Sequence, residues 1–295
     1  MSRAAILVRE VARASDEAGD GRRRAGGVGA RVDALLAPLR AEPDASAVLC
    51  DIDGTLAPIV LDPEEAAVPD DARAVLRDLA RRYALVACIT GRRALEARRI
   101  VGIEEIVYSG NHGLEYLPTG AAEPELDPAV AEGARRARDF VLGLDAEDVS
   151  AAQLRLESKG PIQALHWREA ADQRAARDAA RRIARQAETA GLVPHRGRKV
   201  LEIRPVAGID KGTAVARLLD EAPVELGMFG GDDRGDLDAF TALRSRVDAG
   251  RLRHVACIGV ASDEAPPELG EAADAVVDGP SGFLEVLRAL ATAGD

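Results

Sequence analysis

The sequence has few cysteines and no long apolar segment. Its three cysteines, Cys50, Cys88 and Cys257, are far apart and lie in apolar runs. The odd count and wide spacing argue against a disulfide framework or a zinc site, and favour buried thiols in a reducing compartment. No run reaches the roughly 18 apolar residues needed to cross a bilayer. We therefore expect a cytoplasmic protein that does not contact a membrane.

Basic residues are also outnumbered, with 39 Lys and Arg against 50 Asp and Glu, which gives a net charge of -11. Phosphate backbones would be repelled, so nucleic acid is not expected as a partner. The negative net charge does not exclude a small phosphorylated substrate, if a metal ion and a few local cations neutralise the site that binds it. The 295 residues are 47% hydrophobic, which is enough for a sizeable core and excludes global disorder.

Short apolar runs alternate with helical patterns on both sides of a middle segment. Such alternation predicts a parallel sheet with helices on both faces, and ligands of such sheets bind beyond the carboxyl ends of the strands. The predicted strands are 48–52, 85–89, 106–108, 226–229, 255–260 and 275–277, and the predicted helices are 70–83, 93–101, 211–220, 236–243 and 283–290.

The middle segment, residues 114–207, has a different pattern. Turn-like strings at Lys159–Pro161 and Arg196–Arg198 would close two hairpins, and hairpins require antiparallel pairing. We therefore predict an α/β fold whose core (46–113 and 208–295) carries an inserted α+β cap domain with an antiparallel sheet, placed over the site as a lid. The predicted cap elements are helix 128–142, strands 153–157 and 162–167, helix 169–190, and strands 192–195 and 200–204.

Residues 1–45 form an N-terminal extension in this interpretation. Residues 15–29 are rich in Asp, Gly and Arg without periodicity, so we expect them to be flexible. Val32, Leu35, Leu36 and Leu39 recur at helical spacing and predict a helix packed against the core.

Asp51 and Asp53 stand two residues apart at the end of the first predicted strand, in the string DIDGTL. Two carboxylates at such a place are costly unless a cation compensates them, and oxygen ligands suit magnesium. Gly54 lets the backbone turn tightly, and Thr55 adds a hydroxyl and an amide for a phosphate. An ordinary strand-ending turn would also contain Asp-Gly, but the whole string is far more specific than that pair.

This string resembles the first motif of the haloacid dehalogenase-like phosphatases, and their other motifs follow in order. Ile89–Arg92 ends the second strand like the second motif, and Asp210–Gly212 opens a helix where the family has a lysine. Gly230–Asp236 resembles the acidic fourth motif. Each fragment alone is weak, but four in order at strand ends or helix starts are a strong signal. The resemblance implies a Rossmannoid core of this family and a Mg2+-dependent phosphatase.

The resemblance also implies roles for single residues. Asp51 would attack phosphorus, and with an ordinary pKa near 3.9 it needs no base to ionise it. Asp53 would protonate the leaving oxygen and then activate water, while Thr90 and Lys211 would hold phosphoryl oxygens. The candidate metal residues are Asp51, Asp53 through its carbonyl, Asp232 and Asp233. Of these, Asp233 is expected to support Asp232 rather than to bind the metal directly, and so is Asp236.

Further strings resemble the trehalose-6-phosphate phosphatases over roughly residues 46–290. These are Gly110–Glu115, Glu157–Gly160 with His166–Arg168, Glu202–Pro205 and Gly231–Phe240. The implied substrate is trehalose 6-phosphate. Strand alternation puts Glu157 and Lys159 on one face, and likewise Glu202 and Arg204; a solvated face with salt bridges would have the same pattern. The candidate substrate-binding residues are Thr55, Arg92, Asn111, His112, Glu157, Lys159, Arg168 and Glu202.

Three positions depart from the family pattern: Gly235 and Leu237 replace the usual Thr and Glu, and Trp167 replaces Tyr. Asp232 is retained, so we expect the same reaction. Loss of the Thr hydroxyl and the Glu carboxylate could change how the metal ligands are held and so the affinity for the metal. Two alternatives stay open, namely a phosphatase for another sugar phosphate (sucrose phosphate or mannosyl-phosphoglycerate) and a non-catalytic sugar-phosphate sensor. We expect a monomer, coupled in trans to any trehalose-6-phosphate synthase.

Overall fold

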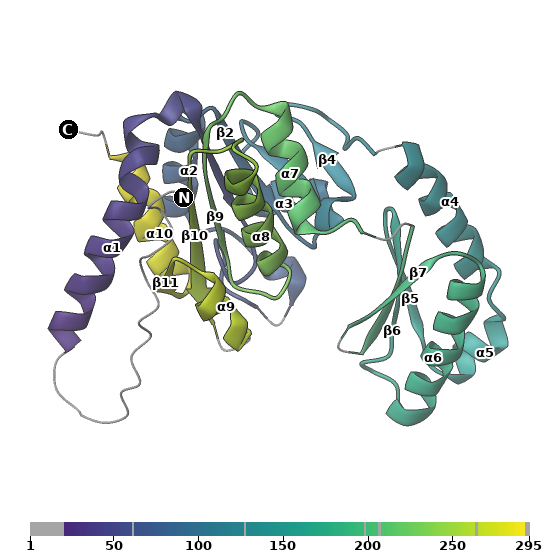
Figure 1. The fold of residues 1–295 in the computed structure, drawn as a ribbon. Helices are drawn as coiled ribbons and strands as arrows, with labels where there is room; N and C mark the ends of the chain where they lie inside the picture. Colours follow the sequence, from purple (N-terminus) through teal and green to yellow (C-terminus); the bar gives the residue numbers. More distant parts are fainter. Residues whose placement is uncertain are drawn as a thin grey trace, which may run out of the picture.

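The computed structural model describes residues 21–60, 62–126, 128–197, 199–205, 208–262 and 265–292. Figure 1 shows a larger α/β core beside a smaller cap that the chain enters after β4 and leaves before α7. Within the described part of the chain, no helix is both long and apolar enough to cross a membrane.

The core is built on one seven-stranded sheet with the strand order β11-β10-β9-β1-β2-β3-β4. All neighbours pair in parallel except β4, which runs antiparallel to β3. The central strand β1 is buried along its whole length, as its apolar sequence requires when helices cover both faces. The strands are β1 (Ser46–Cys50), β2 (Leu85–Ile89), β3 (Val107–Gly110), β4 (Glu115–Leu117), β9 (Leu226–Gly231), β10 (His254–Ala261) and β11 (Ala275–Asp278).

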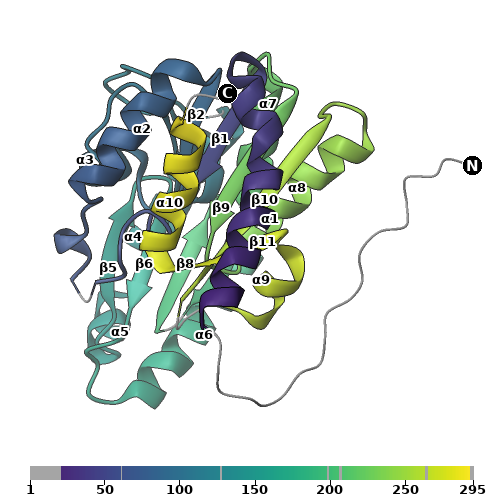
Figure 2. The same cartoon turned by 90° about the vertical axis from the view of Figure 1, so that its left-hand side faces the viewer.

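Helices cover both faces of this sheet. Apolar side chains of α1, α2, α3 and α10 pack on one face and those of α7, α8 and α9 on the other; Figure 2 shows α1, α2 and α10 in front of the sheet. The helices are α1 (Gly21–Ala41), α2 (Asp70–Arg82), α3 (Ala94–Val101), α7 (Lys211–Glu221), α8 (Asp236–Asp248), α9 (Pro267–Ala272) and α10 (Gly279–Ala291), with short 3-10 turns η1 (Pro43–Ala45), η2 (Pro63–Glu65) and η3 (Asn111–Gly113).

Helix α1 confirms the helical spacing seen in the N-terminal extension. Val32, Leu36 and Leu39 are buried, and Leu35 packs beside them. Residues 21–29, which were expected to be aperiodic, belong to α1. Arginines favour helix, and a helix anchored by a packed segment propagates at little cost. Residues 1–20 lie outside the described part of the chain.

The cap is a four-stranded antiparallel sheet in the order β5-β6-β8-β7. Helices α4 and α6 cover one face, where Leu165, Leu201 and Ile203 form a separate small core with them. The predicted fold class, a mostly parallel core sheet with an inserted antiparallel cap, is thus confirmed. The elements are α4 (Pro128–Leu142), α5 (Ala146–Ala151), β5 (Arg155–Lys159), β6 (Ile162–His166), α6 (Gln173–Thr189), β7 (Val193–Gly197) and β8 (Val200–Arg204).

Several details differ from the sequence prediction, among them the unpredicted short helices α5 and α9. Strand β4 was not predicted, and its residues, 115–117, lie in the range assigned to the cap although they pair with the core strand β3. Strand β5 begins two residues later than expected, because Gln153 adopts a left-handed conformation (φ 51°) before it. Helix α6 begins at Gln173, because the Asp172 side chain caps it by accepting from Arg174 N and Ala175 N.

Candidate active site

The candidate catalytic residues meet at the carboxyl ends of three neighbouring strands. Asp51 follows β1, Thr90 follows β2, and Asp232 follows β9, and these strands are adjacent in the sheet. Asp51 and Thr90 are buried, and so is Asp232. Because parallel strands end at one edge, chemistry carried by segments far apart in the sequence converges there, as the sequence analysis expected.

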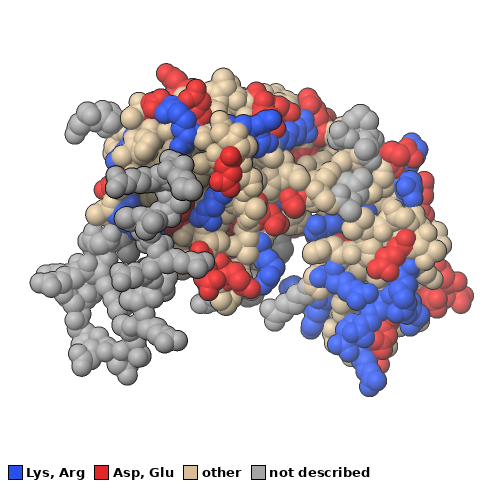
Figure 3. Space-filling model, viewed as in Figure 1, with Lys and Arg blue, Asp and Glu red and all other residues tan. Residues whose placement is uncertain are grey.

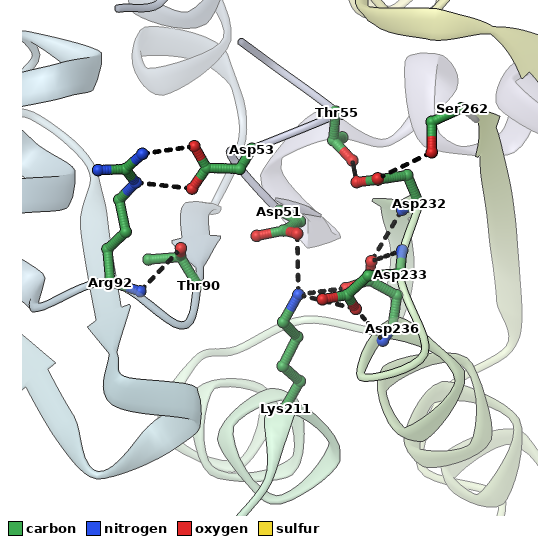
Figure 4. A network of polar contacts seen from close by, with 10 residues as sticks. All are labelled: Asp51, Asp53, Thr55, Thr90, Arg92, Lys211, Asp232, Asp233, Asp236 and Ser262. Atoms are coloured by element: carbon green, nitrogen blue, oxygen red, sulfur yellow. Dashed lines mark hydrogen bonds and ion pairs between the residues drawn. The ribbon is translucent and has the colours of Figure 1, made fainter. Parts of the chain in front are cut away.

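Lys211 lies at the centre of this group (Figure 4). It is the first residue of α7, which Asp210 caps by accepting from Thr213 N. The Lys211 ammonium lies 2.9 Å from Asp51 Oδ2, 2.7 Å from Asp236 Oδ1 and 3.3 Å from Asp233 Oδ1. Its side chain is 1% exposed, so a charge that would otherwise be costly to bury is compensated by three carboxylates.

Burial and charge act in opposite directions on these groups. Burial alone would lower the pKa of Lys211, but Asp236, Asp51 and Asp233 raise it well above its usual value, so the side chain is a permanent cation. Burial raises the pKa of Asp51 to about 7, although Lys211 opposes this. The expectation of an ordinary pKa near 3.9 for Asp51 is therefore wrong in this structure, and a further positive charge beside it would favour its ionised form.

Asp236 organises the loop after β9. Its Oδ2 accepts hydrogen bonds from the amides of Asp232 and Asp233, each at 2.8 Å. A Cβ at Gly231 would come within 2.2 Å of the Asp236 Cγ, so glycine is required there. The sequence analysis gave Asp236 a supporting role; its contact with Lys211 ties the loop to α7 as well. Gly235 and Leu237 leave this arrangement in place.

The carboxylates also leave oxygens suited to a divalent cation. Asp51 Oδ1 is buried without a hydrogen-bond partner, whereas Asp232 is fixed by the Thr55 hydroxyl, which donates to Oδ1 at 2.9 Å. Burial raises the pKa of Asp232 to about 6. The ligand atoms of Asp51, Asp233 and Asp236 lie within 4.8 Å of one another, but Lys211 already neutralises that group. Asp51 thus offers a buried oxygen to a cation, and Asp232, whose Oδ2 accepts from the Ser262 hydroxyl at 3.4 Å, is not among the three carboxylates that Lys211 contacts.

Asp53 and Arg92 form a pair at the edge of the site. The Asp53 side chain is 34% exposed, and Arg92 donates to both of its oxygens. Arg92 was expected to bind substrate; in this structure it lines the cleft and contacts the candidate acid. Thr90 Oγ1 accepts from the Arg92 amide at 3.2 Å, so Thr90 also shapes the loop that carries Arg92.

Asn111 and His112 have left-handed backbone conformations (φ 50° and 58°) just after β3. Asn111 is fully buried, and its Nδ2 donates to the Lys159 carbonyl of the cap at 2.8 Å. Burial, followed by Arg204 and Lys211, lowers the pKa of His112 to about 4, which keeps the ring neutral. In this structure Asn111 links the core to the cap. His112 lies close enough to Arg204 of the cap and Lys211 of the core for their charges to affect its pKa.

The polar face of the cap sheet lines a cleft against the core. Glu157 and Glu202 are aligned across β5, β6 and β8 by the pairing register. Lys159 Nζ donates to Glu202 Oε1 at 3.2 Å, a salt bridge between strands that the alternation did not predict. The cleft has a volume of about 770 Å³, and its lining includes Asp53 and Arg92 from the core and Glu157, Lys159 and Arg168 from the cap. Figure 3 shows the molecule hollowed between core and cap.

Several charged or polar residues of this cleft were not among the candidate site residues, and Glu96, Arg155 and His166 are those that pair with the candidates. Glu96, in the first turn of α3, pairs with Arg92 just before that helix. Arg155 and His166 both line the cleft and pair with Glu157, His166 at 2.8 Å. The i,i+4 spacing of Arg92 and Glu96, and the two-residue alternation from Arg155 to Lys159, were signals that could have identified two of them.

Solved structures of known proteins have a similar fold. A haloacid dehalogenase-like hydrolase from Bacteroides thetaiotaomicron aligns with a TM-score of 0.60 at 14% identity, over 82% of this chain and 98% of that one. The Aspergillus fumigatus trehalose-6-phosphate phosphatase (crystal form 3) aligns with a TM-score of 0.63 at 24% identity, over 89% and 98%. These likenesses establish the fold, a haloacid dehalogenase-like core with an inserted cap.

Sequence similarity is more specific. The model of the trehalose-phosphatase family matches residues 49–266, and the chain belongs to this family. The probable trehalose-phosphate phosphatase 4 of Oryza sativa subsp. japonica is 31% identical over 222 residues, covering 72% of this chain. The chain spans about half the length of such curated relatives, 54% in this case. The family resemblance inferred from the motifs is therefore confirmed.

Proposed function

We propose that the protein is a magnesium-dependent phosphoric monoester hydrolase that converts trehalose 6-phosphate to trehalose and phosphate. The observation that carries the proposal is the pairing of buried Asp51 with Lys211 at the end of β1, beside a cleft whose opposite wall is the polar face of the cap. A carboxylate nucleophile next to a fixed cation is what attack on an anionic phosphate requires.

In the proposed first step, Asp51 attacks phosphorus and an aspartyl-phosphate forms as the sugar oxygen leaves. Lys211 and Thr90 hold phosphoryl oxygens while charge spreads over them. Asp53 protonates the leaving oxygen, because a sugar alkoxide is a poor leaving group, and then activates the water that hydrolyses the aspartyl-phosphate. Magnesium, held by Asp51, Asp232 and the Asp53 carbonyl, would reduce repulsion between the nucleophile and the phosphate.

Magnesium should stabilise the protein more at pH 7.5 than at pH 5. Burial raises the pKa of Asp51 to about 7 and that of Asp232 to about 6. Between about pH 4 and pH 7 the folded chain therefore holds protons that the unfolded chain has lost, so without metal its stability falls as pH rises through this range. Magnesium binds the ionised carboxylates of Asp51 and Asp232, which are formed at pH 7.5 but mostly protonated at pH 5. Melting temperatures with and without magnesium at both pH values test this, and Asp232→Asn should diminish the difference.

Equal magnesium stabilisation at both pH values, or an undiminished effect in Asp232→Asn, would contradict this placement of the metal. Exposed Asp248 on the same core serves as the matched control, because Asp248→Asn should leave the magnesium effect unchanged.

The cap is proposed to recognise the sugar. Glu202 bonds to Lys159 at 3.2 Å and Arg204 at 3.0 Å on the face toward the core, and such acceptors and donors suit adjacent hydroxyls. Glu202→Ala should lower kcat/KM for trehalose 6-phosphate about 10- to 100-fold, and that for p-nitrophenyl phosphate less than about threefold. Arg196→Ala on the neighbouring strand is the control. Equal losses of kcat/KM on both substrates would show that Glu202 of β8 does not recognise the sugar.

One experiment tests the proposed function directly. Phosphate release is measured from a panel of trehalose 6-phosphate, sucrose phosphate, mannosyl-phosphoglycerate and p-nitrophenyl phosphate, with magnesium and with a chelator. We expect magnesium-dependent release, with the highest kcat/KM for trehalose 6-phosphate. Preference for another sugar phosphate would change the substrate, and binding without any release would favour a non-catalytic sensor.

A further inference from the structure

The carboxylate of Asp53 is held in a fixed orientation by Arg92. Arg92 Nε donates to Oδ2 at 2.7 Å and Nη2 donates to Oδ1 at 2.8 Å. A two-point contact of this kind fixes the plane of a carboxylate as well as its position. Figure 4 shows the Asp53 side chain turned toward Arg92 and away from Lys211. The orientation of Asp53 is thus set by a neighbour on a different strand end.

Arg92 is itself held from several sides. Its Nη1 donates to Glu96 Oε1, in the first turn of α3, and its carbonyl accepts from the Asn111 amide at 2.7 Å. The buried Glu115 carboxylate fixes the start of α3 by accepting from Ala94 N at 2.7 Å. The Arg92 side chain is only 14% exposed. The guanidinium is therefore positioned by contacts with Asp53 and Glu96.

Arg92 directs its guanidinium mainly at carboxylates of this chain. All three guanidinium nitrogens of Arg92 already donate to carboxylates, two to Asp53 and one to Glu96. Asp53, Arg92 and Glu96 all line the cleft where the sugar would enter. The Asp53 carboxylate is therefore held at the wall of the cleft in which the leaving sugar oxygen of the proposed reaction would lie.

We propose that Arg92 is a positioning residue that sets the orientation of the Asp53 carboxyl, and that Glu96 in turn positions Arg92. This inference rests on the proposed function, in which Asp53 protonates the leaving sugar oxygen. Displacement of an acid by about 1 Å can cost on the order of 100-fold in rate. Loss of Arg92 should therefore slow departure of a sugar much more than departure of an aryl group, which needs little protonation.

The test compares Arg92→Ala, Arg92→Lys and Glu96→Gln with the wild-type chain. Arg99→Ala, an exposed position on the same helix, is the matched control. Two substrates are used: the sugar phosphate that the wild type hydrolyses best, and p-nitrophenyl phosphate. Rapid quench measures the first turnover, so that release of the leaving group is separated from hydrolysis of the aspartyl-phosphate.

For Arg92→Ala we expect the first-turnover rate on the sugar phosphate to fall about 30- to 100-fold and that on p-nitrophenyl phosphate less than about fivefold. Arg92→Lys should lose less than Arg92→Ala, because lysine keeps a cation beside Asp53, but it should not match the wild type, because lysine cannot make the two-point contact. Glu96→Gln should lose a few-fold with the same selectivity. In an Asp51→Asn background, Arg92→Ala should change the calorimetric Kd for the sugar phosphate less than about twofold.

Equal losses on both substrates, or tenfold weaker binding in the Asp51→Asn background, would overturn the positioning role and leave the proposed function intact. A wild-type chain that releases no phosphate from either substrate would overturn the proposed function, and this inference with it. If Arg92→Ala does not fold, Arg92→Lys must still show the selective loss on the sugar phosphate, and its absence would equally overturn the positioning role.

Discussion

Asp51→Asn should abolish phosphate release, with at least about a 1,000-fold loss of kcat on every substrate, while the chain stays folded. An amide cannot form the covalent bond to phosphorus, and the neighbouring groups cannot replace it. The substitution should not lower the melting temperature at pH 7.5, because burial disfavours the ionised carboxylate and raises the pKa of Asp51 to about 7.

The measurements are phosphate release and thermal melting monitored by circular dichroism. Asp248→Asn, an exposed substitution in the core, should leave both unchanged. More than about 1% of wild-type kcat in Asp51→Asn, after removal of any deamidated protein, would refute the assignment of the nucleophile.

Lys211→Met should cost both activity and stability. Asp51, Asp236 and Asp233 share this one buried cation. Its removal leaves their charges uncompensated, which typically costs about 3–5 kcal/mol for a buried pair. We also expect about a 1,000-fold loss of kcat, because no other group replaces Lys211 at the phosphoryl oxygens.

Urea unfolding at pH 7.5 and pH 5 separates the two effects of Lys211→Met. The free energy of unfolding should recover partly at pH 5, where the stranded carboxylates can bind protons instead. Arg217→Ala, on the exposed side of the same helix, should cost less than about 1 kcal/mol. A Lys211→Met protein as stable as the wild type at both pH values would contradict the electrostatic role of Lys211.

The placement of the central residues could be predicted because it depends only on topology. Asp51, Thr90 and Asp232 each follow an apolar run, and parallel pairing of those runs brings their ends together. Lys211 begins a helix behind a capping residue, which its sequence context already indicated. Periodicity and motif order are sufficient for such positions, since no side-chain conformation enters the argument.

The direction in which individual side chains point could not be predicted. Thr55 donates to Asp232 rather than facing the cleft, Asn111 is buried against the cap, and Asp53 pairs with Arg92. Each outcome depends on side-chain conformations and on neighbours distant in sequence. Strand β4 was missed for another reason, because its three residues are too few to establish a periodic pattern.

The N-terminal helix α1 has a practical consequence for anyone who shortens this chain. The family match begins at residue 49, after α1, yet Leu36 and Leu39 are completely buried against the core. The Leu35 carbonyl also contacts His254 Nε2 at 2.7 Å. Trimming the protein to the matched segment would expose the apolar surface of the core that α1 covers and favour aggregation. A shortened protein should therefore retain α1.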